Sequence, residues 1–128
     1  MPKSKIDFGT VRTIGLALPG VAESTAYGNP ALKLNGQLLA CVPAHRSAEP
    51  GSLLVRVDFE QRAELLAAAP DVYYVPEHYV GYTGVLVRLS RVNRGMLRDL
   101  FGMAHKFLLA SKPPGSFSRN RRKPNSPE

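Results

Sequence analysis

The Asn35-Gly36 dipeptide constrains the fold of this 128-residue chain more than any other feature. Asn-Gly supplies the two positive φ angles of a type I′ turn, whose twist suits a two-residue β-hairpin. Apolar-rich segments on both sides predict strands over residues 31–34 and 37–42, with Leu34 opposite Gln37. In that register Leu32, Leu34, Leu39 and Cys41 share one face of the sheet, and Ala31, Lys33, Leu38 and Ala40 share the other.

Helix-capping residues divide the rest of the chain. Asp7, Asp58 and Asn93 each precede apolar residues at helical spacing, and Gln61 completes a capping box with Asp58. Helices are therefore expected over about 8–18, 59–69 and 94–108, further strands over 52–57 and 85–89, and a short strand over 24–27. Short connections between successive strands favour antiparallel pairing. The chain thus predicts a two-layer α+β domain with helices packed on an antiparallel sheet, in the order helix, three strands, helix, two or more strands, helix.

Positive charge is concentrated at the C-terminal end. The chain has 17 Lys and Arg against 10 Asp and Glu, a net charge of +7. Residues 1–110 contribute +3 and residues 111–128 contribute +4. The last 18 residues contain four prolines and show no apolar periodicity, so we expect a domain over 1–110 followed by a disordered basic tail. Arg119, Arg121, Arg122 and Lys123 are expected to contact polyanions without reading sequence.

Several function classes lack their sequence signals. There is no secretory signal or apolar run long enough to cross a membrane, and the single cysteine, Cys41, fits a reducing cytoplasm. The three histidines are scattered, and neither a phosphate-binding loop nor a dinucleotide fingerprint is present. No metal, cofactor or membrane partner is therefore expected. Cys41 is expected to be inert packing in a strand, so an enzyme is the last of the classes that we consider.

Residues 71–89 contain four of the five tyrosines and lead into the strand at 85–89. A tyrosine ring is apolar and its hydroxyl needs a partner, so this cluster predicts an ordered, partly buried aromatic loop. Tyr73, Tyr74 and His78 are assigned structural roles in it. His78 is expected to bond a tyrosine hydroxyl or the backbone, with an acid/base pair between His78 and Glu77 as the alternative.

Basic residues interrupt the apolar strands. Lys33, Arg56 and Arg88 are each expected on the sheet face opposite the helices, and Arg46 lies in the loop after the hairpin. These four residues could contact DNA phosphates, and Tyr79 and Tyr82 could stack on a base or sugar. The alternative is that they are ordinary exposed charges whose aliphatic stems cover the sheet.

Three segments carry a resemblance to a known family: YGNPALKLNGQLLA at 27–40, DVYYV at 71–75 and HYVGY at 78–82. Over roughly residues 5–110 the chain resembles the MmcQ/YjbR-like family of small bacterial proteins. The resemblance implies an α-β-β-β-α-β-β-α fold, related to secretion chaperones and frataxin-like proteins, and a double-wing mode of DNA binding through hairpins. We therefore expect a monomeric, cytoplasmic, non-catalytic DNA-binding protein. The alternative is a module that binds an acidic protein or peptide.

Overall fold

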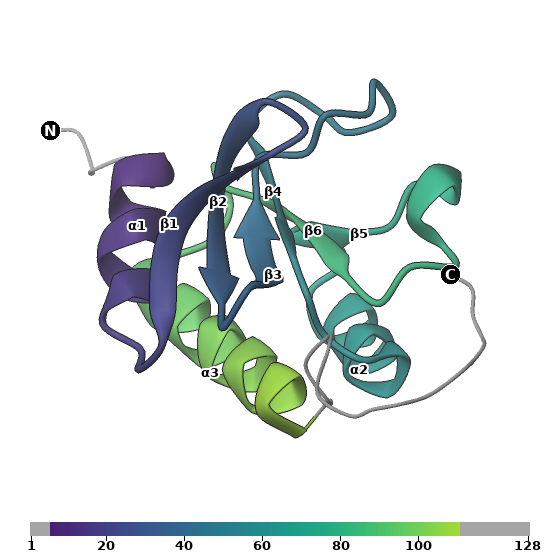
Figure 1. The fold of residues 1–128 in the computed structure, drawn as a ribbon. Coiled ribbons are helices and arrows are strands. Elements are labelled where there is room, and N and C mark those ends of the chain that lie inside the picture. Colours follow the sequence, from purple (N-terminus) through teal and green to yellow (C-terminus); the bar gives the residue numbers. More distant parts are fainter. Residues whose placement is uncertain (1–5, 111–128) are drawn as a thin grey trace, which may run out of the picture.

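A computed structural model describes residues 6–110 (Figure 1). Residues 1–5 and the predicted basic tail, with Arg119, Arg121, Arg122 and Lys123, lie outside the described residues. The elements in chain order are α1 (Phe8–Leu16), β1 (Val21–Ala26), β2 (Asn29–Leu34), β3 (Gln37–Cys41), β4 (Ser52–Val55), α2 (Phe59–Ala68), β5 (Tyr73–Tyr74), the 3₁₀ turn η1 (Glu77–Tyr79), β6 (Val85–Arg88) and α3 (Arg94–Ala110).

The strands form one six-stranded sheet in the order β1-β2-β3-β4-β6-β5, in which every neighbouring pair is antiparallel. The predicted α+β class is therefore confirmed. The strand expected over 24–27 overlaps the second half of β1, but β1 ends at Ala26 and Tyr27 lies in the turn; four strands precede α2. Two-residue turns join β1 to β2 and β2 to β3, and the loop 42–51 joins β3 to β4; no crossover helix is needed because the strands are antiparallel.

The predicted helix caps all form. Asp7 Oδ1 accepts a hydrogen bond from the Thr10 amide at 3.1 Å, and Asn93 Oδ1 accepts one from the Met96 amide at 2.8 Å. At α2 both bonds of the capping box are present, between Asp58 and Gln61. Each cap satisfies an amide that the first helical turn leaves without a partner.

The main core lies between the helices and one face of the sheet (Figure 1). Leu97, Leu100 and Phe101 of α3 are buried there, and Phe101 is 0% exposed. Val11 of α1 packs against the same core, and Leu65 of α2 borders it. Helices therefore cover only one face of the sheet.

A β-bulge in the β2–β3 hairpin changes which face its residues occupy. Leu34 pairs with Gln37 as predicted, but the register shifts between Leu32 and Lys33, and Leu32 pairs with Ala40. Strict alternation was therefore a wrong expectation for the end of β3, because a bulge adds one residue to one strand. Ala40 belongs to the helix-side core with Leu32, whereas Cys41 faces the opposite side of the sheet.

The opposite face of the sheet is also covered. Cys41, Leu54 and Leu86 form a second apolar cluster on it, and Tyr79 closes over them. Tyr79 and Tyr82 come from the segment 75–84 between β5 and β6, and Ala48 comes from the loop 42–51 between β3 and β4. These two loops leave a hollow over β3 and β4, which contains the candidate site.

Within residues 6–110, no helix combines the length and apolar character that a membrane span requires.

Candidate functional site

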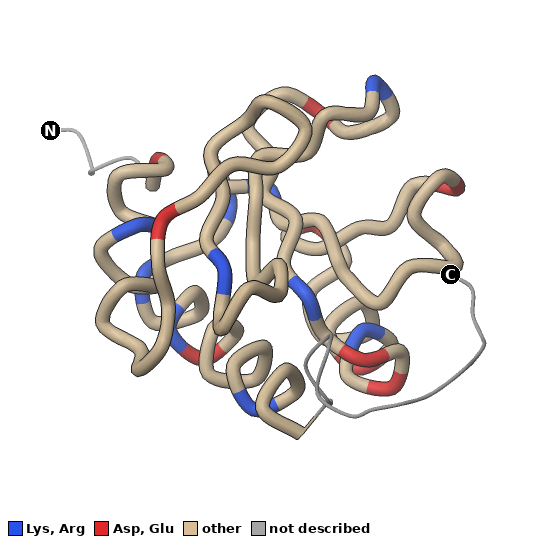
Figure 2. The backbone as a smooth tube through the Cα atoms, viewed as in Figure 1, with Lys and Arg blue, Asp and Glu red and all other residues tan. Residues whose placement is uncertain are grey.

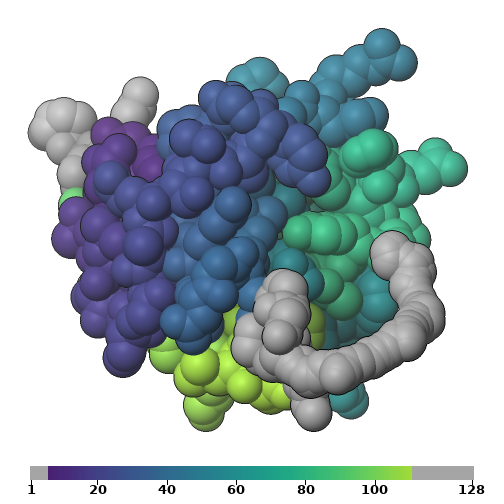
Figure 3. Space-filling view, viewed as in Figure 1, coloured from purple at the N-terminus to yellow at the C-terminus, as the bar shows by residue number. Residues whose placement is uncertain are grey.

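The hollow is an apolar pocket of about 450 Å³. Figure 3 shows it between the blue surface of the β1–β2 hairpin and the green surface of residues 75–84. It falls within the size range of small-ligand pockets, roughly 300–1,000 Å³. Its lining consists of Tyr27, Leu38, Cys41, Pro43, Ala44, His45, Leu54, His78, Tyr79 and Tyr82.

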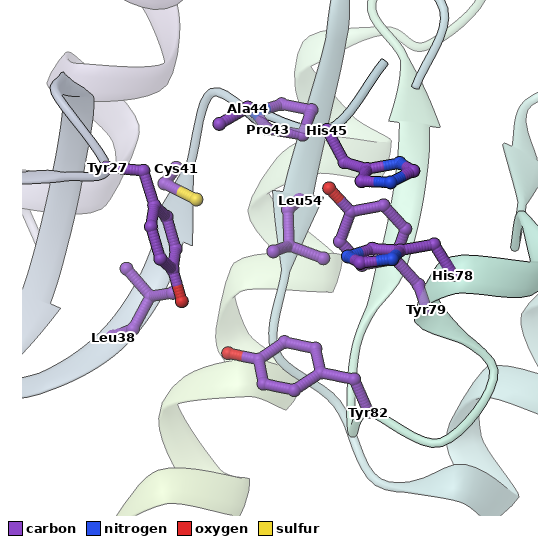
Figure 4. Close-up of a pocket in the computed structure, with 10 residues that line it drawn as sticks. All are labelled: Tyr27, Leu38, Cys41, Pro43, Ala44, His45, Leu54, His78, Tyr79 and Tyr82. Atoms are coloured by element: carbon purple, nitrogen blue, oxygen red, sulfur yellow. The ribbon is translucent and has the colours of Figure 1, made fainter. Parts of the chain in front are cut away.

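Tyr27 stands at the rim of the pocket at the turn between β1 and β2. Its backbone φ is +56° and that of Gly28 is +80°, the pair of positive angles that a type I′ turn uses. Gly28 tolerates this conformation, but it strains a tyrosine. Tyr27 is 83% exposed. Its ring lies on the opposite side of the pocket from Tyr79 (Figure 4). Sequence reasoning missed Tyr27, which it places at the end of the strand expected over 24–27, although a tyrosine directly before the Gly-Asn-Pro of residues 28–30 was a visible signal of a turn.

His45 and His78 form the wall opposite Tyr27 (Figure 4). Their rings are stacked, with centroids 3.5 Å apart and planes 7° apart. The Tyr79 ring lies edge-on to both. The expected hydrogen bond from His78 to a tyrosine hydroxyl or the backbone is not found within residues 6–110, because its ring packs on His45 instead. The stack joins the loop 42–51 to η1.

Four side chains of the pocket lining have pKa shifts that favour their neutral forms. Burial raises the pKa of the Cys41 thiol to about 11, and it also raises the pKa of Tyr79 and Tyr82. Burial, with smaller contributions from His78 and Arg46, lowers the pKa of His45. None of the lining residues is Lys, Arg, Asp or Glu. The pocket therefore suits an uncharged group.

Arg62 of α2 holds the segment 75–84 in place. Its Nη1 donates to the carbonyl oxygens of Tyr79, Tyr82 and Gly84 at 2.9–3.3 Å, and its Nη2 donates to that of Val80 at 2.8 Å. Desolvation lowers the pKa of this guanidinium, which nevertheless stays charged near neutral pH. Sequence reasoning missed this role, since an arginine on an amphipathic helix gives no sign of which carbonyls it will reach.

Two of the four arginines and lysines predicted to bind DNA are engaged within the protein. Arg88 donates to both carboxylate oxygens of Glu49 at 2.9 Å, and its guanidinium lies 4.3 Å from the centroid of the Tyr74 ring. Arg56 donates to the backbone and hydroxyl oxygens of Thr83 at 2.8 Å, and it lies over the Tyr82 ring. These contacts tie the two loops to the sheet.

The other two cations differ in their surroundings. Arg46 is exposed in the loop 42–51, and Lys33 is partly exposed on β2, between two residues that face the helices. Neither side chain forms a hydrogen bond or ion pair within the described part of the chain. No hydrogen bond or ring contact among the described residues joins any two of the four residues predicted to bind DNA.

Tyr73 and Tyr74, predicted in a loop, form the edge strand β5. Tyr73 is buried in the helix-side core. The Tyr74 hydroxyl accepts a hydrogen bond from the Glu49 amide at 2.7 Å and bonds the Ser52 hydroxyl, so it anchors the end of loop 42–51. The remaining predicted residues, Tyr79 and Tyr82, both line the pocket.

Charge over the described domain is nearly balanced. Residues 6–110 contain ten Lys and Arg and nine Asp and Glu, a net charge of +1. Figure 2 shows the two signs interleaved over the elements. Among these residues, no three His, Cys, Asp or Glu side chains come together as a metal site would require.

A family model gives the family of the chain, and a solved structure shares its fold. The YjbR family model matches residues 16–107. The chain is similar to a solved structure, the Deinococcus radiodurans protein DR2400 with its DUF419 domain, with a TM-score of 0.65 and 19% identity. That similarity covers 93% of this chain and 87% of the other. No curated protein matches the sequence. Because the family model spans most of the described domain, the chain belongs to the YjbR family.

Proposed function

We propose that this protein is a non-catalytic binding module whose pocket holds an aromatic or apolar side chain of a polypeptide partner. The observation that carries the proposal is Tyr27. Tyr27 is a bulky residue in a strained backbone conformation, exposed at the rim of an apolar pocket. For the stability of the fold, asparagine or glycine would serve as well at this position. Strain of this kind clusters at ligand-binding sites, where selection for function outweighs its cost.

The charges around the pocket suggest the rest of the partner. The lining is uncharged, and the exposed Arg46 follows the lining residue His45 directly. An acidic residue beside the anchoring side chain would pair with Arg46 at the rim. The partner in this proposal is therefore an extended, acidic segment with one aromatic anchor. A nucleophilic role for Cys41 has no support, because its raised pKa keeps the thiol protonated.

Replacing Tyr27 with asparagine is expected to separate binding from stability. Asparagine accepts positive φ more readily, so the free energy of unfolding should stay level or rise by about 1 kcal/mol. Binding should weaken by about 2 kcal/mol, roughly 30-fold, as for an aromatic hot spot. The probe is N-acetyl-tryptophanamide, whose fluorescence is readable because the protein contains no tryptophan. Acetylated, amidated Asp-Trp-Asp should bind more tightly than Lys-Trp-Lys.

Leu16→Ser is the matched control, because it removes an exposed apolar side chain on α1, away from the pocket lining. It should leave binding of both probes unchanged. Equal binding by wild type and Tyr27→Asn, or no saturable binding by the wild type, would contradict the proposal.

DNA binding is the second candidate function, and the exposed Arg46 on the loop 42–51 favours it. This loop borders the pocket opposite the β1–β2 hairpin, so the two segments could serve as paired wings. Lys33 and Arg46 are the available phosphate contacts in this proposal. Direct phosphate contacts by Arg56 and Arg88 stay predictions. To bind DNA, these side chains would have to break their hydrogen bonds to Thr83 and Glu49.

The dependence of DNA affinity on salt concentration is expected to give the number of phosphate contacts. Each neutralised phosphate contributes about −0.9 to the slope of log affinity against log salt, so two contacts give about −1.8 and four give about −3.6. We expect the lower magnitude for a chain ending at Ala110, because of the four predicted contacts only Arg56 and Arg88 are held by hydrogen bonds within residues 6–110. Fluorescence titration of a labelled duplex with the alanine variants at three salt concentrations measures this. No binding by that shortened chain at low salt would assign any DNA affinity to residues 111–128.

A further inference from the structure

The stacked histidines occupy a position from which they can control the pocket. His45 belongs to the loop 42–51 and His78 to η1, so the ring stack is a direct contact between the two loops that border the pocket. Tyr79 packs edge-on to both rings and also covers the second apolar cluster. Separating the two rings would therefore remove one wall of the pocket.

The hydrogen bonds of His45 identify its protonation state. The Ser47 amide donates to His45 Nδ1 at 3.1 Å, and the Ser47 hydroxyl lies 2.8 Å from the same nitrogen. A backbone amide can only donate, so Nδ1 carries no proton and the neutral ring has its proton on Nε2. Protonation would add a proton at Nδ1 and set two donors against each other. The turn from His45 to Ser47 therefore depends on a neutral ring.

The neighbouring charges oppose protonation as well. Arg46 on the same loop and His78 on η1 both lower the pKa of His45, after the larger effect of burial. The acidic residues of the two loops do not offset them: Glu49 is bound to Arg88, and the Glu77 carboxylate forms no hydrogen bond or ion pair within residues 6–110. Tyr79, which packs against both rings, is a further titratable group, and burial raises its pKa, so its hydroxyl stays neutral.

We propose that His45 and His78 form a pH-sensitive clasp, which holds the pocket in its binding shape at neutral pH and releases it in mild acid. The clasp acts on the binding site proposed above and rests on that function for its ligand. Since the pKa of His45 lies below the ordinary value of about 6.5, the neutral stack stabilises the closed loops fully above that value. The stabilisation is lost as the pH falls through the lowered pKa. One pH unit below it, affinity should be about tenfold weaker, because one proton must leave for the ligand to bind.

The test measures N-acetyl-tryptophanamide binding to the full chain from about pH 7.5 to about pH 5, a range that brackets histidine titration. His45→Phe keeps an aromatic ring for the stack but cannot be protonated, so its affinity should not vary with pH. His105→Phe is the control, because His105 on α3 bonds the Pro19 carbonyl and does not line the pocket. It should retain the pH dependence of the wild type.

A second measurement keeps the clasp testable if the probe does not bind. NMR titration of the free protein should show the amides of residues 44–47 shifting together with the His45 ring, and the His45 pKa should rise in His78→Phe. Failure of the probe at every pH, with this coupling intact, would overturn the proposed function and support the clasp. A wild-type affinity that stays constant while His45 titrates, or amides 44–47 that ignore the titration, would overturn the clasp.

Discussion

Replacing Phe101 with alanine is expected to destabilise the protein by about 3–5 kcal/mol, a large part of the 5–15 kcal/mol that holds a typical domain folded. The ring is 0% exposed and lies in the helix-side core. It also packs against α1 so closely that a Cβ added to Gly15 would lie 3.1 Å from Phe101 Cε2. The lost ring would therefore leave a cavity between two helices and the sheet. Chemical denaturation followed by circular dichroism measures the loss.

Leu109→Ala is the matched control for Phe101→Ala, because it shortens an apolar side chain on the same helix at a position that is 57% exposed. Its effect should lie within about 0.5 kcal/mol of zero, as for most surface substitutions. Similar midpoints for the two variants would show that α3 does not pack as the structure has it.

Replacing Arg62 with alanine is expected to abolish probe binding while the main core stays folded. The side chain provides donors to four carbonyl groups of residues 79–84, and no other side chain reaches those four groups in the described part of the chain. Hydrogen bonds to a charged group contribute about 1.5–3 kcal/mol each in favourable cases, and partial exposure lowers the total here to about 2–3 kcal/mol. Since Tyr79 and Tyr82 belong to this segment, the pocket should lose its aromatic wall.

Native-state hydrogen exchange distinguishes this local effect from global unfolding. In Arg62→Ala the amides of residues 79–84 should exchange faster, while those of Leu100 and Phe101 keep most of their protection. Arg62→Lys should fall between alanine and wild type, because an ammonium is a point donor and cannot span the carbonyls as a guanidinium does. Arg98→Ala, on the exposed side of α3, should change neither binding nor exchange. Uniform loss of protection in Arg62→Ala would contradict a local role.

Local signals made most of the fold predictable. The caps at Asp7, Asp58 and Asn93, the Asn35-Gly36 turn and the Leu34–Gln37 register all depend on residues within a few positions of one another. Apolar spacing on α3 likewise placed Leu100 and Phe101 in the core. Tyr79 and Tyr82 are predicted to stack on a base or sugar, and this role stays a prediction; the structure places both in the pocket lining.

The tertiary structure decided which residues far apart in the chain contact one another. The bulge that moves Cys41 to the pocket face follows from pairing across three strands, where the Leu39 carbonyl accepts a bond from the Arg56 amide at 2.9 Å. Arg88 looked like a free surface charge, but Glu49, 39 residues away, binds it. The sequence by itself determined the three helices, their caps and the Asn35-Gly36 turn, because these depend on local backbone preferences. The pocket, the His45–His78 stack and the carbonyl site of Arg62 were decided only by the packed fold, because side chains from separate loops meet only after the sheet has brought those loops together.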